Sequence, residues 1–165
     1  MEGSTLISFD NLIAVLEEYR MAVIDTYKKH LTDNDHIASH GLIDNIRYQI
    51  IKDGKSVEVD LILKDYWKYL ENGTKPHFPP ISAILEWIKV KPVLPSQTYN
   101  GKLPTEKQLA FLIARKISEV GTKGTHDLHD ALAEVNNRYE QRIGEAINQD
   151  LNSAMISILT EFQMK

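Results

Sequence analysis

The sequence contains no cysteine among its 165 residues. Disulfide frameworks, thiol catalysis, iron–sulfur clusters and zinc sites that need thiolate ligands are therefore excluded. It also lacks an uninterrupted apolar run of the roughly 18 residues that a membrane-spanning helix needs, so we expect no membrane partner. The first five residues are acidic and polar, unlike a secretory signal, and we expect a protein that stays where it is made.

The sequence also lacks a strong excess of either sign of charge. The chain has 19 basic and 23 acidic residues, a formal net charge of −4, and no basic run is longer than two residues. Such a chain has no general attraction to nucleic acid or to an anionic membrane. It has neither a glycine-rich phosphate loop nor a Gly-x-Ser-x-Gly nucleophile elbow. We therefore expect no cofactor and no enzyme active site.

What is present is typical of a globular chain. Hydrophobic residues make up 42% and charged residues 25% of the sequence, which is close to the average for soluble domains. A chain of this length can bury a sizeable core but leaves little room for two independent ones. We expect a single domain over residues 1–165.

Three segments have the apolar spacing of amphipathic helices. Apolar residues recur three and four positions apart in residues 9–31, where Ser8 is the expected N-cap. The same spacing predicts helices over residues 81–90 and 105–120. The last of these opens with Thr105 and Gln108, which have the form of a capping box.

The longest helical pattern covers residues 126–162. It predicts one long C-terminal helix, or two helices with a bend near Gly144 or near residues 148–152. If straight, it would reach roughly 55 Å, more than a domain of this size covers along its own surface. We therefore expect its end to lean on a neighbouring chain.

Residues 45–63 predict a β-hairpin with one apolar face. Apolar and polar side chains alternate on both sides of Asp53-Gly54, and Leu42–Ile46 is expected to open the first strand. An isolated hairpin is marginal in water, so its apolar face must pack on a helix. The predicted fold is α+β: a long N-terminal helix and C-terminal helices packed on a small antiparallel sheet built around the hairpin. Residues 91–104 predict an exposed loop, and further strands are possible there or in residues 121–126.

The histidines offer one weak metal pattern. His126 and His129 stand three residues apart beside Asp127 and Asp130, a spacing that on a helix could present two ligands. Acidic residues at a helix start are more simply explained by the helix dipole. A small metal-dependent hydrolase is therefore the least favoured alternative, and we expect no metal site. The remaining candidates are expected to be solvated, namely the loop histidines His36 and His40 and the strand carboxylates Glu58 and Asp60.

The densest aromatic segment follows the hairpin. Tyr66, Trp67 and Tyr69 cannot all face one core from a short turn of helix, so at least one should be exposed. Tyrosine and tryptophan at such positions are favoured interface anchors. The alternative is that Trp67 and Tyr69 simply cover the hairpin. Gly73-Thr74 then allows a tight reversal of the chain.

The stretch Glu71-Asn72-Gly73-Thr74-Lys75-Pro76, placed after an amphipathic helix, a hairpin and aromatic residues, resembles the minor tail and neck proteins of tailed bacteriophages. These are often called tail-completion or head–tail joining proteins. The order matches from about Leu42 to Leu132 and includes Gly121-Thr122-Lys123-Gly124-Thr125. Residues 81–95 and 105–120 look like the form in phages of gut Bacteroidetes. The sequence departs from the family at His126-Asp127, where proline and phenylalanine are expected.

The resemblance implies a structural virion protein and not an enzyme. It implies a homo-oligomeric ring at the neck or tail junction that joins portal or head to tail, contacts other neck, portal or tail proteins, and lets genomic DNA pass without sequence-specific binding. Its location would be the virion, and the host cytoplasm during assembly. The alternative is a soluble cytoplasmic binding or regulatory module with a single partner. The resemblance assigns to packing or ring contacts the residues Tyr66, Trp67, Tyr69, Glu71, Gly73, Thr74, Lys75 and Pro76.

Overall fold

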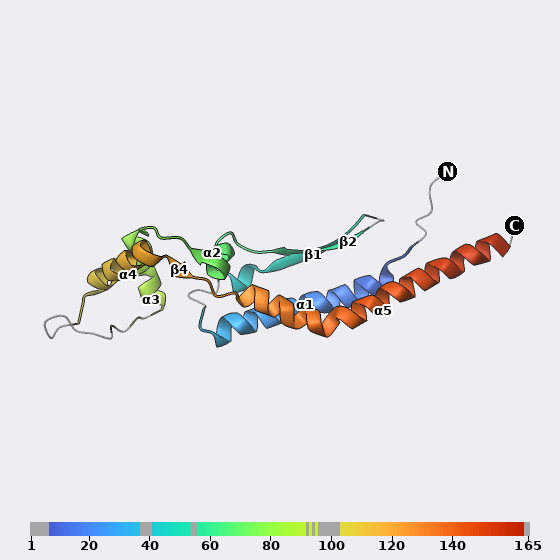
Figure 1. The fold of residues 1–165 in the computed structure, drawn as a ribbon, viewed down its shortest axis with the longest axis horizontal. Helices are drawn as coiled ribbons and strands as arrows, with labels where there is room; N and C mark the ends of the chain where they lie inside the picture. Colours follow the sequence, from blue (N-terminus) through green and yellow to red (C-terminus); the bar gives the residue numbers. More distant parts are fainter. Residues whose placement is uncertain are drawn as a thin grey trace. The chain divides into compact units, whose positions relative to one another are not determined.

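The structure is a computed structural model that describes residues 7–36, 41–53, 56–91, 93, 95 and 103–163. These residues form an α+β fold with five α-helices and two small antiparallel sheets, which confirms the predicted fold class (Figure 1). The contacts divide the chain into two compact units. Unit 1 comprises residues 1–30, 45–63 and 128–165, and unit 2 comprises residues 31–44 and 64–127.

Unit 1 is built on an antiparallel pair of helices. α1 (Asp10–Asp33) and α5 (Asp127–Gln163) lie side by side, and the apolar spacing that predicted each helix buries one face of each (Figure 1). α5 is one continuous helix of 37 residues. The contacts that align the pair are Asn11 with Asp150, Glu18 with Arg142, Thr26 with Arg138 and His30 with Glu134. Its buried apolar residues are Leu16, Val23, Tyr27, Leu128, Ala131, Val135, Ala146 and Ala154.

The N-terminus of α1 is capped from α5 and not from its own flank. The carboxylate of Asp150, only 3% exposed, accepts hydrogen bonds from the backbone N–H groups of Asn11 (3.2 Å) and Leu12 (3.0 Å). The expected cap, Ser8, donates its hydroxyl to Asp10. A carboxylate satisfies the unpaired N–H groups of a first turn and complements the helix dipole. The prediction for Ser8 was therefore wrong, because a buried acidic partner from a distant segment takes the position.

The hairpin consists of β1 (Arg47–Lys52) and β2 (Val57–Ile62), paired antiparallel from Arg47 opposite Ile62 to Lys52 opposite Val57. Tyr48 joins it to α1, because the Arg20 guanidinium lies 4.6 Å from the centre of its ring. The first strand begins later than predicted, since residues 43–45 form a 3₁₀ turn, η1 (Ile43–Asn45). Short polar side chains such as those at 44 and 45 compete with strand pairing for backbone groups. Gly54 of the predicted turn lies outside the described residues.

Unit 2 contains α2 (Trp67–Asn72), β3 (Gly73–Thr74), α3 (Ile81–Val90), α4 (Glu106–Val120) and β4 (Thr122–Lys123). The helices α3 and α4 pack against each other, and Ala110 and Ala114 of α4 are fully buried. Small side chains at these positions let two helix backbones approach closely. The capping box is confirmed, because Thr105 and Gln108 each accept a hydrogen bond from the other's backbone N–H.

The two strands of unit 2 form a sheet of their own. β3 pairs with β4, whereas the prediction extended a single sheet from the hairpin. The second sheet arises because each of its strands continues directly from the end of a helix, α2 or α4. Of the predicted loop at 91–104, residues 92, 94 and 96–102 lie outside the described residues. Among the helices described, none has an apolar stretch long enough to traverse a bilayer.

Candidate interface site at a glycine–threonine crossing

Two Gly-Thr dipeptides from distant parts of unit 2 lie against each other. Gly73-Thr74 follows the end of α2, and Gly121-Thr122 follows the end of α4. Thr74 lies directly opposite Thr122 in the antiparallel pair. Both glycines have a positive φ, 72° and 73°, in the region that side chains with a Cβ rarely adopt. We call residues 73–74 and 121–124 the Gly-Thr crossing.

The backbones approach so closely that only glycine fits. A Cβ atom on Gly121 would lie 1.9 Å from the carbonyl oxygen of Thr74, and one on Gly73 would lie 2.2 Å from that of Thr122. At Gly124 the same atom would lie 2.3 Å from the carbonyl oxygen of Glu71. These separations are far inside van der Waals contact. The three glycines therefore set the distance between the two segments.

Hydrogen bonds hold the crossing together and continue beyond it toward α5. The hydroxyl oxygens of Thr74 and Thr122 lie 3.0 Å apart, and the backbone N–H of Thr122 donates to the Thr74 hydroxyl at 3.2 Å. Beyond it, the N–H of Thr125 donates to the carbonyl of Leu70 at 2.8 Å. Carbonyls at the end of a helix need such partners. The last turn of α2 is thus tied to the segment that leads into α5.

A surface hollow lies beside the crossing. It has a volume of about 590 Å³ and is lined by Tyr69, Gly73, Thr74, Lys75, Pro76 and His77. We call it the Tyr69 hollow. Tyr69 is 63% exposed, although it is a large aromatic residue. Among the described residues that line the hollow, Lys75 is basic and none is acidic. The hollow therefore offers an aromatic wall and positive charge on a rigid backbone.

Most of the predicted interface segment lines this hollow. Five of its six lining residues belong to the predicted set, whereas Tyr66, Trp67 and Glu71 lie outside its wall. Tyr66 is 38% exposed, and partial burial raises the pKa of its phenol. Trp67 is half-buried and Glu71 is buried. The expectation that at least one of the three aromatic residues is exposed is confirmed by Tyr66 and Tyr69.

A buried carboxylate lies at the start of α5. From the sequence this residue, Asp127, was named only as a neighbour of the histidine pair, and no buried contact was predicted for it. Asp127 is 2% exposed, and its oxygens lie 2.7 Å from the amide nitrogen of Asn34 and 2.6 Å from Nδ1 of His36. Burial alone would raise the pKa of Asp127, but hydrogen bonds from Asn34 and His36 outweigh burial and lower it. The prediction that His36 is simply solvated was therefore wrong. His40 lies outside the described residues.

The predicted histidine pair does not share a helix face. His126 precedes the first residue of α5 and has a φ of 59°, whereas His129 lies within the helix with Nδ1 3.2 Å from a carboxylate oxygen of Asp130. The spacing argument for a metal required both histidines on one helix, so it fails here. No group of three potential ligands occurs within the described ranges. The strand carboxylates Glu58 and Asp60 are exposed, as predicted.

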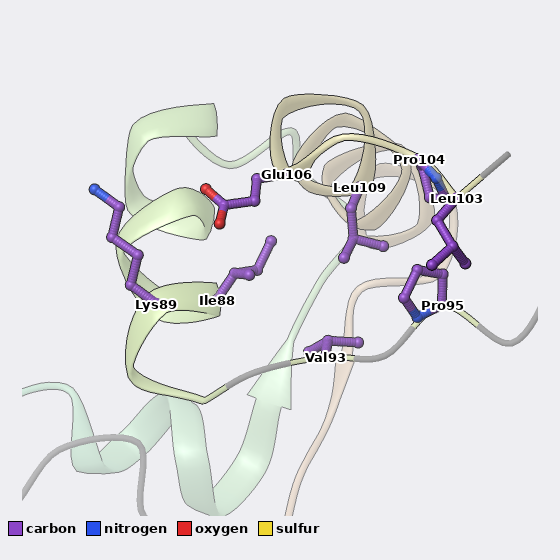
Figure 2. A pocket seen from close by; sticks show the side chains of 8 residues that line it. All are labelled: Ile88, Lys89, Val93, Pro95, Leu103, Pro104, Glu106 and Leu109. Atoms are coloured by element: carbon purple, nitrogen blue, oxygen red, sulfur yellow. The ribbon is translucent and has the colours of Figure 1, made fainter.

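A second hollow of about 410 Å³ lies between α3 and α4 (Figure 2). Its lining is mainly apolar, and its two charged side chains, Lys89 and Glu106, have opposite signs. We call it the α3–α4 hollow. Its lining residues are Ile88, Lys89, Val93, Pro95, Leu103, Pro104, Glu106 and Leu109. It lacks the converging polar groups that orient a small-molecule ligand.

Comparison with known proteins identifies no relative of this chain. The chain matches no family model, no curated protein and no solved structure. Evidence for the function of the chain therefore lies in the residues of the site.

Proposed function

We propose that this protein is a structural subunit of the neck or tail junction of a tailed bacteriophage. Copies of the chain form a ring that joins the portal or head to the tail and surrounds the path of the DNA. The observation that carries the proposal is the Tyr69 hollow, because five of the eight residues that the phage resemblance assigns to packing or ring contacts line it. Aromatic side chains exposed beside a hollow are typical anchors of protein interfaces.

The rigidity of the site favours this role. The Gly-Thr crossing fixes the segment through close backbone contacts at Gly73, Gly121 and Gly124. A surface held in its binding conformation loses little conformational entropy when a partner docks. Repeated identical contacts in a ring benefit from such a surface, because every copy must present the same geometry.

The charge of the chain is compatible with a DNA passage. A formal charge of −4 gives little general attraction to a polyanion. A protein that surrounds moving DNA must not hold it through phosphate contacts. The protein would therefore let DNA pass without reading its sequence.

Gradient-purified virus particles from the source culture provide the direct test. We expect mass spectrometry to detect this chain in the particles and electron cryomicroscopy to place it in several copies at the head–tail junction. If the chain occurs only in the soluble fraction of infected cells, in complex with one other protein, the neck assignment is wrong and the binding-module alternative holds.

A variant links the particle result to the hollow. Tyr69→Ala should fold like the natural chain, because Tyr69 is mostly exposed, but should be lost from particles. Leu112→Ala is a suitable control, since Leu112 is 51% exposed and lies outside the hollow. Equal incorporation of Tyr69→Ala and Leu112→Ala would show that the hollow is not a ring contact.

A further inference from the structure

The last part of α5 extends past its partner helix within unit 1 (Figure 1). The contacts of Asp150 with Asn11 and Leu12 mark the first turn of α1. Residues 151–163 continue for about 20 Å beyond that point. We call these residues the overhang. One side of it is covered, since Ala154 is buried and Ile158 is half-buried. Its other five large apolar side chains are exposed: Leu151 by 42%, Met155 by 59%, Ile156 by 65%, Leu159 by 62% and Phe162 by 77%.

The chemistry of α5 changes where the overhang begins. Before it, the row Glu140, Gly144 and Asn148 follows the helix at four-residue steps. In the overhang Leu151 and Met155 lie on the same side of the helix, and residues 151–160 carry no charge at all. Helix surfaces in water are normally polar, whereas an uncharged apolar one is normally covered. The overhang therefore has the composition of a helix that packs against protein.

The hydroxyl side chains of the overhang need no hydrogen bond from water. The hydroxyls of Ser153, Ser157 and Thr160 each donate to a backbone carbonyl four residues earlier, at 2.9, 3.0 and 2.9 Å. A donor already satisfied within its own helix loses no hydrogen bond when the surface is covered. Covering the exposed side of the overhang thus leaves none of these three hydroxyls without an acceptor.

We propose that the overhang of one copy docks in the Tyr69 hollow of the next copy. This inference rests on the proposed ring and names the partner of its contact site. The two surfaces belong to different parts of one chain, so each copy can offer the overhang to one neighbour and the hollow to the other. A contact between two different patches is the head-to-tail type that closes rings.

Charge and an aromatic side chain favour the Tyr69 hollow as the acceptor. Glu161 is the one charged residue of the overhang, and the charged residue of the hollow is Lys75. The α3–α4 hollow offers Lys89 and Glu106, whose opposite charges give no preference for a single carboxylate. Phe162, beside Glu161, supplies an aromatic anchor for the wall that includes Tyr69.

The size of the overhang predicts a weak single contact. Its apolar patch is on the order of a few hundred Å², below the roughly 800 Å² that each partner contributes to a standard interface. Two copies should therefore associate weakly in solution. A closed ring stabilises each contact, because every copy is held on both sides.

The absence of cysteine allows a clean cross-linking test with the full chain. Phe162→Cys is prepared with an isotopic label and mixed at high concentration with unlabelled Tyr69→Cys, and disulfides are formed under mild oxidation. Both positions are exposed, so circular dichroism should show unchanged folding. We expect a labelled–unlabelled disulfide at least about tenfold more abundant than in the control that pairs Phe162→Cys with Leu103→Cys of the α3–α4 hollow. Pro76→Cys is a second acceptor variant in case Tyr69→Cys alters the hollow.

Charge reversal sharpens the result. Glu161→Lys in the labelled chain should reduce the cross-link, and Lys75→Glu in the unlabelled chain should restore it. The inference is overturned if disulfides between two copies of Phe162→Cys dominate, if the Leu103→Cys control cross-links equally, or if no cross-link forms with either acceptor. Particle composition is a separate measurement. If the chain is present in particles but this cross-link does not form, the docking is wrong and the neck assignment stands. If the cross-link forms but the chain is absent from particles, the neck assignment is wrong and the docking stands.

Discussion

The hydroxyl oxygens of Thr74 and Thr122 lie 3.0 Å apart although 48 positions separate the two residues in the sequence. Each threonine follows a glycine that ends a helix, so the contact joins the ends of α2 and α4. The same crossing forms one side of the Tyr69 hollow, since Gly73 and Thr74 line it. The stability of unit 2 and the shape of the candidate interface therefore depend on the same few backbone contacts.

Gly121→Ala should strongly destabilise the protein. The new Cβ would meet the Thr74 carbonyl at 1.9 Å, and a φ of 73° adds further strain. We expect a loss of at least about 3 kcal/mol in the free energy of unfolding, measured with urea. Gly144→Ala is the control, because nothing lies within 4 Å of its added Cβ inside α5. It should gain about 0.5–1 kcal/mol, and similar losses for both variants would refute the steric role of the crossing.

Asp150→Ala should weaken the pairing of α1 with α5. It removes the acceptor of the backbone N–H groups of Asn11 and Leu12, which are then left without a partner in the protein. A loss of about 1–3 kcal/mol is expected in urea unfolding. The exposed Asp60→Ala should stay within about 0.5 kcal/mol of the natural chain. If Asp150→Ala behaves like Asp60→Ala, the cap from α5 does not stabilise the fold.

Asp127 should make the protein sensitive to acid. Its pKa is lowered from the ordinary 3.8 in the folded state, so ionisation of this carboxylate stabilises the fold. That contribution is complete above the unfolded pKa and is lost as the pH falls through the folded one. Unfolding of Asp127→Asn, followed from pH 7 to pH 2, should therefore show a smaller loss of stability in the acid range. Parallel curves for Asp127→Asn and the natural chain would contradict this assignment.

Phe162→Ser should leave the stability of the isolated chain unchanged within about 0.5 kcal/mol, because Phe162 is 77% exposed. Val135→Ala is the matched control on the same helix. Val135 is fully buried, so its truncation should cost about 1–3 kcal/mol. Thermal unfolding at low protein concentration measures both. A large loss in Phe162→Ser would mean that the overhang packs within its own chain, which would exclude it as a docking segment.

The helices were predictable because their signals are local. The three- and four-residue apolar spacing predicted residues 81–90, which are the bounds of α3, and the long C-terminal helix, which begins at Asp127. Thr105 and Gln108 predicted the start of α4, because a capping box involves only four consecutive residues. The sequence indicated two features of the Tyr69 hollow, an exposed aromatic residue and the turn at the Gly-Thr dipeptide. It did not predict that these residues line a hollow.

The remaining contacts join residues that no sequence window contains. Asp150 caps a helix start 139 positions away, and Asp127 meets His36 across 91 positions. β3 and β4 are two residues long and have no alternating pattern, so only their approach to each other makes them strands. These features depend on how the folded chain packs, and propensity and period carry no information about them.

The sequence by itself determined the α+β class, the helical segments and the absence of thiol chemistry, since composition and periodicity act over short stretches of chain. Only the tertiary structure decided that Gly73 and Gly121 meet, that a hollow forms beside Tyr69 and that α5 extends beyond α1. The physical reason is that each of these features is a distance between segments far apart in the chain. Such distances are set by the packing of both segments at once.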